Sequence, residues 1–311
     1  MNSFSLDPEL IHRRASILRS IRNFFYERKV LEVEVPVVGA YSVTDPYLDA
    51  LSVDMDGQEH FLQTSPEYFL KRLLAGGSGD LYSLGKAFRR DERGRIHRPE
   101  FTMLEWYRLD FDDLQLMQEL AQLLSVLHPG IDPEYCSYRD LFVDACGIDP
   151  HAATASQLRG VAVRALDIHW PDEDKNLWLD LLFTHIVEPT LHKRCVFVYD
   201  YPASQCALAR LAQDDRGVLV AKRFELYWQG LELANGYWEL RDVNEQRGRF
   251  EADNQRRRAE GKVERQIDPL FMQAMEVGLP NCAGVALGID RLIMCLLQLG
   301  SIHEQHLQLQ P

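Results

Sequence analysis

The residues best suited to chemistry lie in an arginine-rich loop between two strand-like runs. Residues 88–101 read FRRDERGRIHRPEF and contain five arginines and one histidine. A further arginine, Arg291, follows the small-residue run 283–288 at the expected start of a helix. Guanidinium groups bind phosphate oxygens through paired hydrogen bonds, so these residues would suit a polyphosphate ligand. Taken alone, however, a charged run of this kind is more often a solvated loop.

Side chains with carboxylate or amide oxygens lie at period-two positions on two aromatic-rich runs, 224–228 and 230–240. They are Glu225, Glu232, Asn235 and Glu239. Buried carboxylates are costly unless they meet a cation. Arginines for phosphate oxygens and carboxylates for Mg²⁺ together predict a metal–triphosphate site. The sequence has no G-x-x-x-x-G-K-[ST] loop and no G-x-G-x-x-G after a strand, so a nucleotide would be held by side chains on a sheet.

The composition indicates a compact α/β or α+β protein of the cytoplasm. The chain has 311 residues, 34 Lys+Arg against 47 Asp+Glu, and a formal charge of −13, which argues against non-specific nucleic-acid binding. No apolar run approaches the ~20 residues of a membrane span, and the first residues do not resemble a signal peptide. The six cysteines form no C-x-x-C pair, which favours reduced thiols.

Hydrophobic spacing predicts how these residues are positioned. Expected helices cover 8–29, 69–74, 113–127, 244–261 and 290–299, and expected strands cover 30–36, 80–89, 100–109, 194–199, 222–228, 230–240 and 283–288. Residues 129–190 give mixed, mostly helical signals. Because hairpin-like pairs outnumber βαβ alternations, we expect an α+β fold with a mainly antiparallel sheet flanked by helices.

Ordered motifs across the chain resemble those of class II aminoacyl-tRNA synthetases. The stretch ending at Pro36 resembles motif 1, residues 88–107 resemble motif 2, and residues 284–291 resemble motif 3. Residues 64–73 and 232–236 are similar to the lysyl branch of that family. The resemblance covers essentially the whole chain and rests on several motifs in the family's order.

A lysyl-type core without an anticodon module resembles the elongation factor P–(R)-β-lysine ligases. The motif 1 helix begins within about ten residues of Met1, so we expect a single catalytic domain, 1–311, with no anticodon-binding domain. The resemblance implies ATP and Mg²⁺ as cofactors and (R)-β-lysine as substrate, with lysine weaker. It also implies elongation factor P as the protein substrate, a homodimer, and neither tRNA nor membrane binding.

The resemblance also implies roles for residues of the ATP site. Arg89 would contact the α-phosphate and the substrate carboxylate, and Arg291 would bind the γ-phosphate, so these two are the expected catalytic residues. Glu225 and Glu232 would hold Mg²⁺, with Asn235 beside them. The full set of implied ATP-binding residues is Arg89, Arg90, Asp91, His97, Arg98, Phe101, Glu232, Leu233, Asn235, Gly288 and Arg291.

A substrate with two amines needs carboxylates to bind them, and the lysyl-family pocket positions supply these. The implied substrate-binding residues are Ser65, Pro66, Glu67, Glu105, Tyr107, Glu239 and Ala286. Ala286 stands where the tRNA-charging enzymes have glycine. We expect its methyl group to shift the substrate backbone and to favour a β-amino acid over an α-amino acid.

Four features depart from the family pattern or stay open. Arg98 replaces the family's asparagine, and the stretch 301–311 does not resemble the expected closing apolar strand. Residues 303–306 read HEQH, one residue short of H-E-x-x-H, and we do not expect a metal there. The triplet 256–258 reads as a solvated helix face, or alternatively as a docking patch for an acidic protein.

Two other functions remain possible at the level of sequence. A free-standing synthetase-like enzyme would charge tRNA or another carrier. A synthetase-derived regulator would sense an amino acid without catalysis, but such proteins usually lose catalytic groups, whereas Arg89, Glu225 and Arg291 are present.

Overall fold

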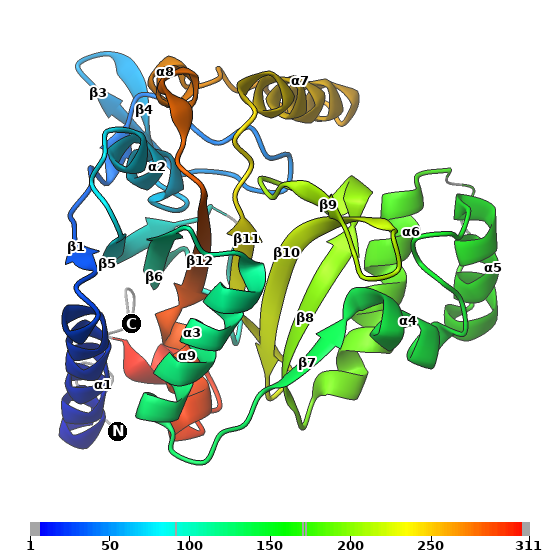
Figure 1. Cartoon of the computed structure of the whole chain (residues 1–311), viewed down its shortest axis with the longest axis horizontal. Coiled ribbons are helices and arrows are strands. Elements are labelled where there is room, and N and C mark those ends of the chain that lie inside the picture. Colours follow the sequence, from blue (N-terminus) through cyan, green and yellow to red (C-terminus); the bar gives the residue numbers. More distant parts are fainter. Residues whose placement is uncertain (1–6, 91, 170, 172, 307–311) are drawn as a thin grey trace.

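A large sheet runs through the centre of the molecule (Figure 1). The computed structural model describes residues 7–306 apart from 91, 170 and 172, and within them nine strands form this sheet. The order is β1-β5-β6-β12-β11-β10-β8-β7, with β9 paired to β10. The strands are β1 (Leu31–Glu32), β5 (Leu81–Phe88), β6 (Glu100–Leu109), β7 (Glu134–Ser137), β8 (Cys195–Pro202), β9 (Leu211–Gln213), β10 (Leu219–Trp228), β11 (Leu231–Trp238) and β12 (Cys282–Gly288).

Most neighbouring strands of this sheet are antiparallel. The parallel pairs are β1 with β5 and β7 with β8, which lie at the two ends of the strand order. The central pairs β5–β6, β6–β12, β12–β11 and β11–β10 are all antiparallel. The predicted α+β fold, an antiparallel sheet flanked by helices, is therefore confirmed.

Three helices cover one face of the sheet and enclose the main core. They are α1 (Pro8–Glu27), α3 (Asp113–Leu127) and α9 (Ile289–Leu297). Phe25 of α1 stacks on Tyr82 of β5 with ring centroids 4.5 Å apart. Asp112 caps α3 through a capping box with Gln115, which fixes where this helix begins.

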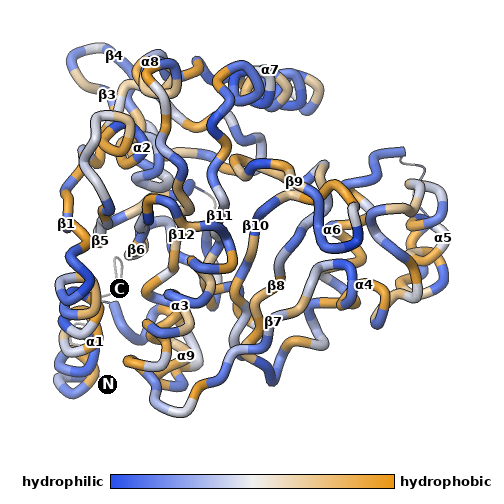
Figure 2. Tube along the Cα trace, viewed as in Figure 1, coloured by the Kyte–Doolittle hydropathy of each residue, from blue (hydrophilic) through white to orange (hydrophobic). Residues whose placement is uncertain are grey.

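The opposite face carries α2 (Glu67–Ala75), α7 (Val243–Ala259) and α8 (Pro269–Gly278), grouped at the top of Figure 1. Leu70 of α2, Phe250 of α7 and Phe271 of α8 belong to one buried cluster with Tyr107 of β6. Figure 2 shows α7 as largely hydrophilic, as its sequence predicts. This side of the sheet carries the polar site described below.

The segment between β7 and β8 is mainly helical, as predicted. It contains α4 (Tyr138–Cys146), α5 (Ala155–Leu166), α6 (Lys175–Leu182), a π-helical turn (Phe183–Val187) and a 3₁₀ turn (Glu188–Leu191). These helices pack around Trp178 and on β8, and they form a second core at one end of the sheet.

Several local predictions were wrong. Only Leu31–Glu32 of the predicted strand 30–36 is a strand. Among the described residues it pairs with β5 alone, and this pairing stops before Pro36, which has no backbone N–H to donate. The small sheet β2 (Val38–Gly39), β4 (Gln58–Leu62) and β3 (Ser52–Met55), the helix α8 and the strand β7 were not predicted.

Two further observations bear on the composition. None of the described helices is both long and apolar enough to span a bilayer. All six cysteines are free thiols, as expected from their spacing.

The arginine triplet 256–258 at the end of α7 is only partly a solvated face. Arg257 is 1% exposed and donates to Asp45 O and Asp49 Oδ1, which corrects the prediction of a solvated face for that residue.

Candidate active site

A cavity of about 890 Å³ lies over the sheet face that carries α2 and α7. It brings together nearly all of the predicted site residues, from both the ATP set and the substrate set. Pro66 and Arg90 do not line it, and Asp91 lies outside the described residues. The predicted residues that line the cavity are Ser65, Glu67, Arg89, His97, Arg98, Phe101, Glu105, Tyr107, Glu225, Glu232, Leu233, Asn235, Glu239, Ala286, Gly288 and Arg291.

The strand register arranges the polar residues in rows. One row crosses four strands, since Glu105 lies opposite Ala286, Ala286 opposite Asn235, and Asn235 opposite Glu225. Directly opposite residues point to the same face, and so do residues two apart on one strand. Asn235 and Glu239 share the cavity side by period two, but Glu232 stands three residues before Asn235 and by period two alone would point away. A register shift between Leu226 and Tyr227 places Glu232 opposite Tyr227, two residues from Glu225, so Glu232 also faces the cavity.

Arginines close the cavity at the end nearest the motif 2 loop (residues 89–99). Arg291, on the first turn of α9, donates to Glu232 O at 3.0 Å and to Ile96 O at 3.3 Å. Arg89 pairs with Glu92 at 3.0 Å, and its guanidinium lies 5.1 Å from the centre of the Phe101 ring. Arg89 and Arg291 both line this cavity, and the charges of both lower the pKa of Glu232 against the effect of burial, so the two expected catalytic residues share one cavity.

Two other basic groups contribute to this end. Burial lowers the pKa of His97, and the nearby Arg291 lowers it further. Arg98, which replaces the family's asparagine, is buried at the cavity wall and forms no salt bridge within the described part of the chain. An anionic ligand would supply the negative charge that the Arg98 guanidinium does not find among the described residues.

Glu225 and Glu232 lie on neighbouring strands. Glu225 accepts hydrogen bonds from Tyr201 at 2.7 Å and Tyr227 at 2.6 Å, and it pairs with Arg223. Burial and the charge of Glu225 raise the pKa of Glu232. Two carboxylates that repel each other fit a divalent cation, and Mg²⁺ needs only one or two protein carboxylates when phosphates and waters complete its shell.

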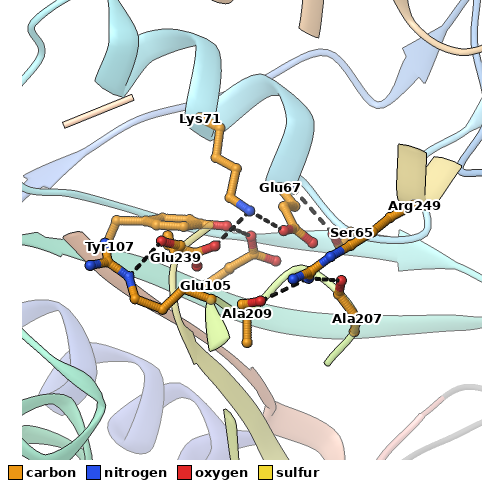
Figure 3. Close-up of polar contacts among 10 residues, drawn as sticks. Ser65, Glu67, Lys71, Glu105, Tyr107, Ala207, Ala209, Glu239 and Arg249 are labelled. Atoms are coloured by element: carbon orange, nitrogen blue, oxygen red, sulfur yellow. Dashed lines mark hydrogen bonds and ion pairs between the residues drawn. The ribbon is translucent and has the colours of Figure 1, made fainter. Parts of the chain in front are cut away.

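The far end of the cavity holds three glutamates around one lysine (Figure 3). Lys71 Nζ lies 2.5 Å from Glu67 Oε1 and 2.7 Å from Glu239 Oε2. Tyr107 donates its hydroxyl proton to Glu105 Oε1 at 2.8 Å. Glu105 Oε2 and Glu239 Oε1 are buried and receive no hydrogen bond from the described residues. These two oxygens are open acceptors for a ligand.

The electrostatics of this pocket indicate a cationic ligand. Burial is the main cause that raises the pKa values of Glu105 and Glu239, and the neighbouring Glu67 raises them further, while Lys71 opposes the shift. Three carboxyl groups face one ammonium group, so the fully ionised pocket carries an excess of two negative charges. A molecule with two ammonium groups would balance it.

Backbone details fix the shape of the pocket. A Cβ on Gly284 would lie 2.2 Å from Tyr107 Cε1, so only glycine fits there. Ser65 Oγ accepts the backbone N–H of Glu67 at 3.2 Å at the start of α2. Arg249 donates to the carbonyls of Ala207 (2.6 Å) and Ala209 (2.7 Å), and so fixes the outer loop shown in Figure 3.

Sequence reasoning missed two residues of this site. Lys71 reads as an exposed position of a short helix, although its spacing of four residues from Glu67 is a signal of pairing. Arg223, which bridges Glu225 and Asn235 Oδ1, stands two residues before Glu225 on β10 and so shares its face. Lys71 is buried and Arg223 is half-buried, and each also has a partner that is more distant in the sequence, Glu239 and Asn235 respectively.

Comparison with known proteins agrees with this geometry. The family of class II tRNA synthetases (D, K and N) matches residues 8–307. An elongation factor P–(R)-β-lysine ligase of Vibrio cholerae serotype O1 is 47% identical over 94% of this chain and 92% of its own. Ligases of the same name from Photobacterium profundum (44%; 94% and 93%) and Photorhabdus laumondii (46%; 92% and 90%) are similar. The chain therefore belongs to the elongation factor P–(R)-β-lysine ligases, a branch of the class II tRNA synthetase family.

Proposed function

We propose that the protein activates (R)-β-lysine with ATP and joins it to a lysine ε-amine of elongation factor P. The observation that carries this proposal is the buried pocket of three glutamates around Lys71, which opens into a cavity lined at its other end by arginines. The names of the relatives support the same reaction. Carbon–nitrogen bond formation by such an enzyme needs a carboxylate made reactive, and ATP supplies that activation.

The first step is adenylate formation. A carboxylate oxygen of β-lysine attacks the α-phosphorus of ATP, and pyrophosphate leaves. The two reacting groups are both anionic, so catalysis consists mainly of positioning and charge neutralisation. Arg89 would orient the carboxylate against the α-phosphate. Arg291 would hold the outer phosphates, with His97 and Arg98 beside them.

Magnesium would bind between the strand carboxylates and the phosphates. Glu225 and Glu232 are the residues that would hold it, with Asn235 next to Glu225. Bound there, Mg²⁺ would neutralise charge on the phosphate oxygens. Arg223 already pairs with Glu225 and would have to share this carboxylate or turn aside.

The glutamate pocket would bind the two amines of the substrate. Glu105 and Glu239 offer buried oxygens without donors, and Glu67 completes the set. Ala286 lies between Glu105 and Asn235 on the floor of the site, where its methyl group would set the position of the substrate backbone. We propose that this position selects the β-isomer.

The second step transfers the acyl group. The neutral ε-amine of the acceptor attacks the carbonyl carbon of the adenylate, AMP leaves with the electrons of the broken C–O bond, and the amine loses a proton.

Further parts of the proposal are a single catalytic domain over 1–311, a cytoplasmic location and a homodimer. Exposed apolar residues on and after α1, namely Ile11, Tyr26 and Leu31, support the dimer.

Intact-mass measurement of elongation factor P tests the function. The factor is incubated with the protein, ATP, Mg²⁺ and either (R)-β-lysine, (S)-β-lysine or L-lysine. We expect one added β-lysyl group, formed fastest with the (R)-isomer and absent without ATP. Transfer of labelled lysine to bulk tRNA with none to elongation factor P would contradict the proposal, and so would the absence of any amino-acid-dependent pyrophosphate exchange.

A further inference from the structure

The segment 301–306, which the family resemblance left unexplained, lies against both parts of the chain that carry the phosphate-facing arginines. It forms a short 3₁₀ turn (Ile302–Gln305) with a capping box between Ser301 and Glu304. Ile302 is 2% exposed, and it also lines the large cavity. The HEQH run that follows it also makes contacts within the protein, through His303, Gln305 and His306.

One set of contacts holds the tip of the motif 2 loop. Arg95 O accepts from Ile302 N at 2.9 Å and from Ser301 Oγ at 3.2 Å. Arg95 Nη1 donates to Gly300 O at 3.1 Å. His303 Nε2 lies 3.0 Å from Gly94 O, and because a carbonyl only accepts, this nitrogen carries the hydrogen. Four contacts thus tie residues 300–303 to the loop tip.

A second set of contacts surrounds Asp290, the residue before Arg291. Asp290 is 1% exposed, and its Oδ1 lies 2.7 Å from Arg14 Nη1 and 3.2 Å from His306 Nε2. Its Oδ2 accepts the backbone N–H of Thr102 at 2.8 Å. Burial would raise the pKa of Asp290, but the contacts with His306 and Arg14 hold it below its usual value.

Gln305 completes this arrangement. Its side chain donates to Asp290 O at 2.7 Å and accepts from Arg14 Nη1 at 2.6 Å. Arg14 in turn donates to Thr102 Oγ1 at 2.9 Å. Segments from α1, β6, α9 and the 301–306 segment therefore meet at one buried carboxylate, immediately next to Arg291.

We propose that the 301–306 segment positions the ATP site by fixing the motif 2 loop and the start of α9 relative to each other. Arg291 donates to Ile96 O from one side of the loop tip, and the 301–306 segment binds Gly94 and Arg95 from the other. Apart from Ile302, the residues of this segment do not line the cavity, so they are positioning residues. The inference rests on the proposed binding of ATP in this cavity.

Equilibrium ATP binding, followed by calorimetry in the presence of Mg²⁺, tests the inference independently of the acceptor. A chain ending at Gly300 is expected to bind ATP more than about tenfold more weakly, because several hydrogen bonds to the loop are lost. A chain ending at His306 keeps every contact described above and should bind ATP within about twofold of the full chain.

Point variants keep the test decisive if the shorter chain does not fold. His303→Ala removes one hydrogen bond at the exposed end of the segment and should weaken ATP binding by about three- to tenfold. His303→Gln, whose amide can donate to Gly94 O, should restore it, and His12→Ala on the exposed face of α1 is the matched control. Binding of β-lysine alone should not change in any of these variants.

Two outcomes would overturn the inference. One is an ATP dissociation constant for His303→Ala within twofold of that of His12→Ala. The other is an equal loss of β-lysine and ATP binding, which would indicate general loosening of the protein. Failure of the proposed ligation would be recognised separately, as ATP binding without modification of elongation factor P.

Discussion

Adding a single methyl group at Gly284 should impair substrate binding through Tyr107. The new Cβ would lie 2.2 Å from Tyr107 Cε1, whereas ordinary contacts begin near 3.4 Å, so the ring must move by about 1.2 Å. The Tyr107 hydroxyl now donates to Glu105 Oε1 at 2.8 Å, and such a shift takes it out of hydrogen-bonding range. Loss of a hydrogen bond to a carboxyl group costs about 1.5–3 kcal/mol, which corresponds to about a 10- to 100-fold rise in the KM for β-lysine.

Gly236→Ala is a matched control for this change. Its Cβ would lie 2.4 Å from Phe224 Cζ, but Phe224 is in the main core on the opposite face of the sheet. Both variants should lose about 1–3 kcal/mol of stability from overpacking, seen as a lower thermal midpoint. Only Gly284→Ala should raise the KM for β-lysine in pyrophosphate exchange, with the KM for ATP unchanged. Equal substrate KM values in the two variants would refute the reasoning.

Four further predictions concern charged residues of the site. Arg89→Ala should lower ATP–pyrophosphate exchange by about 10²–10³-fold, and a rate within tenfold of the original would remove Arg89 from the mechanism. Lys71→Met should reduce the free energy of unfolding by about 3–5 kcal/mol near neutral pH, because Glu67 and Glu239 lose their buried cation, whereas exposed Lys193→Met should not; equal losses in the two variants would contradict this. Since the pKa values of Glu105 and Glu239 are raised to about 8, the empty folded protein holds more protons than the unfolded chain between about pH 4.5 and pH 8, so its stability should fall as the pH rises through that range. Binding of β-lysine near pH 7 should release protons, which calorimetry in buffers of different ionisation enthalpy would detect as a buffer-dependent heat.

The order and type of the central elements could be predicted from hydrophobic spacing. The hairpin around the arginine-rich loop was confirmed as β5 and β6, and the run 283–288 was confirmed as β12. These elements have strong local signals, because alternating or small residues end in clear turns. The shared face of Glu225 and Glu232 did not follow from period two, because it depends on the register shift between β10 and β11.

The remaining parts depend on contacts between distant segments. Lys71 is 1% exposed and pairs with Glu239, which directly follows β11 and lies far from α2 in the sequence. The role of residues 301–306 depends on Arg14 and Arg95, which lie about 200 to 290 residues earlier in the sequence. Local periodicity contains no information about such pairings. A two-residue strand such as β1 is too short to show the alternation of apolar and polar residues that predicts a strand.

An enzyme whose unfilled pocket crowds acidic groups together is most fragile when its amino acid is scarce. Any cationic ligand that settles between those groups shifts the folding equilibrium toward the native state by mass action. Proteases in the cell degrade the unfolded fraction, so a cell that makes little β-lysine should also retain less of this protein. Supply of the modifying group and abundance of the modifying enzyme would then rise and fall together without a dedicated regulator.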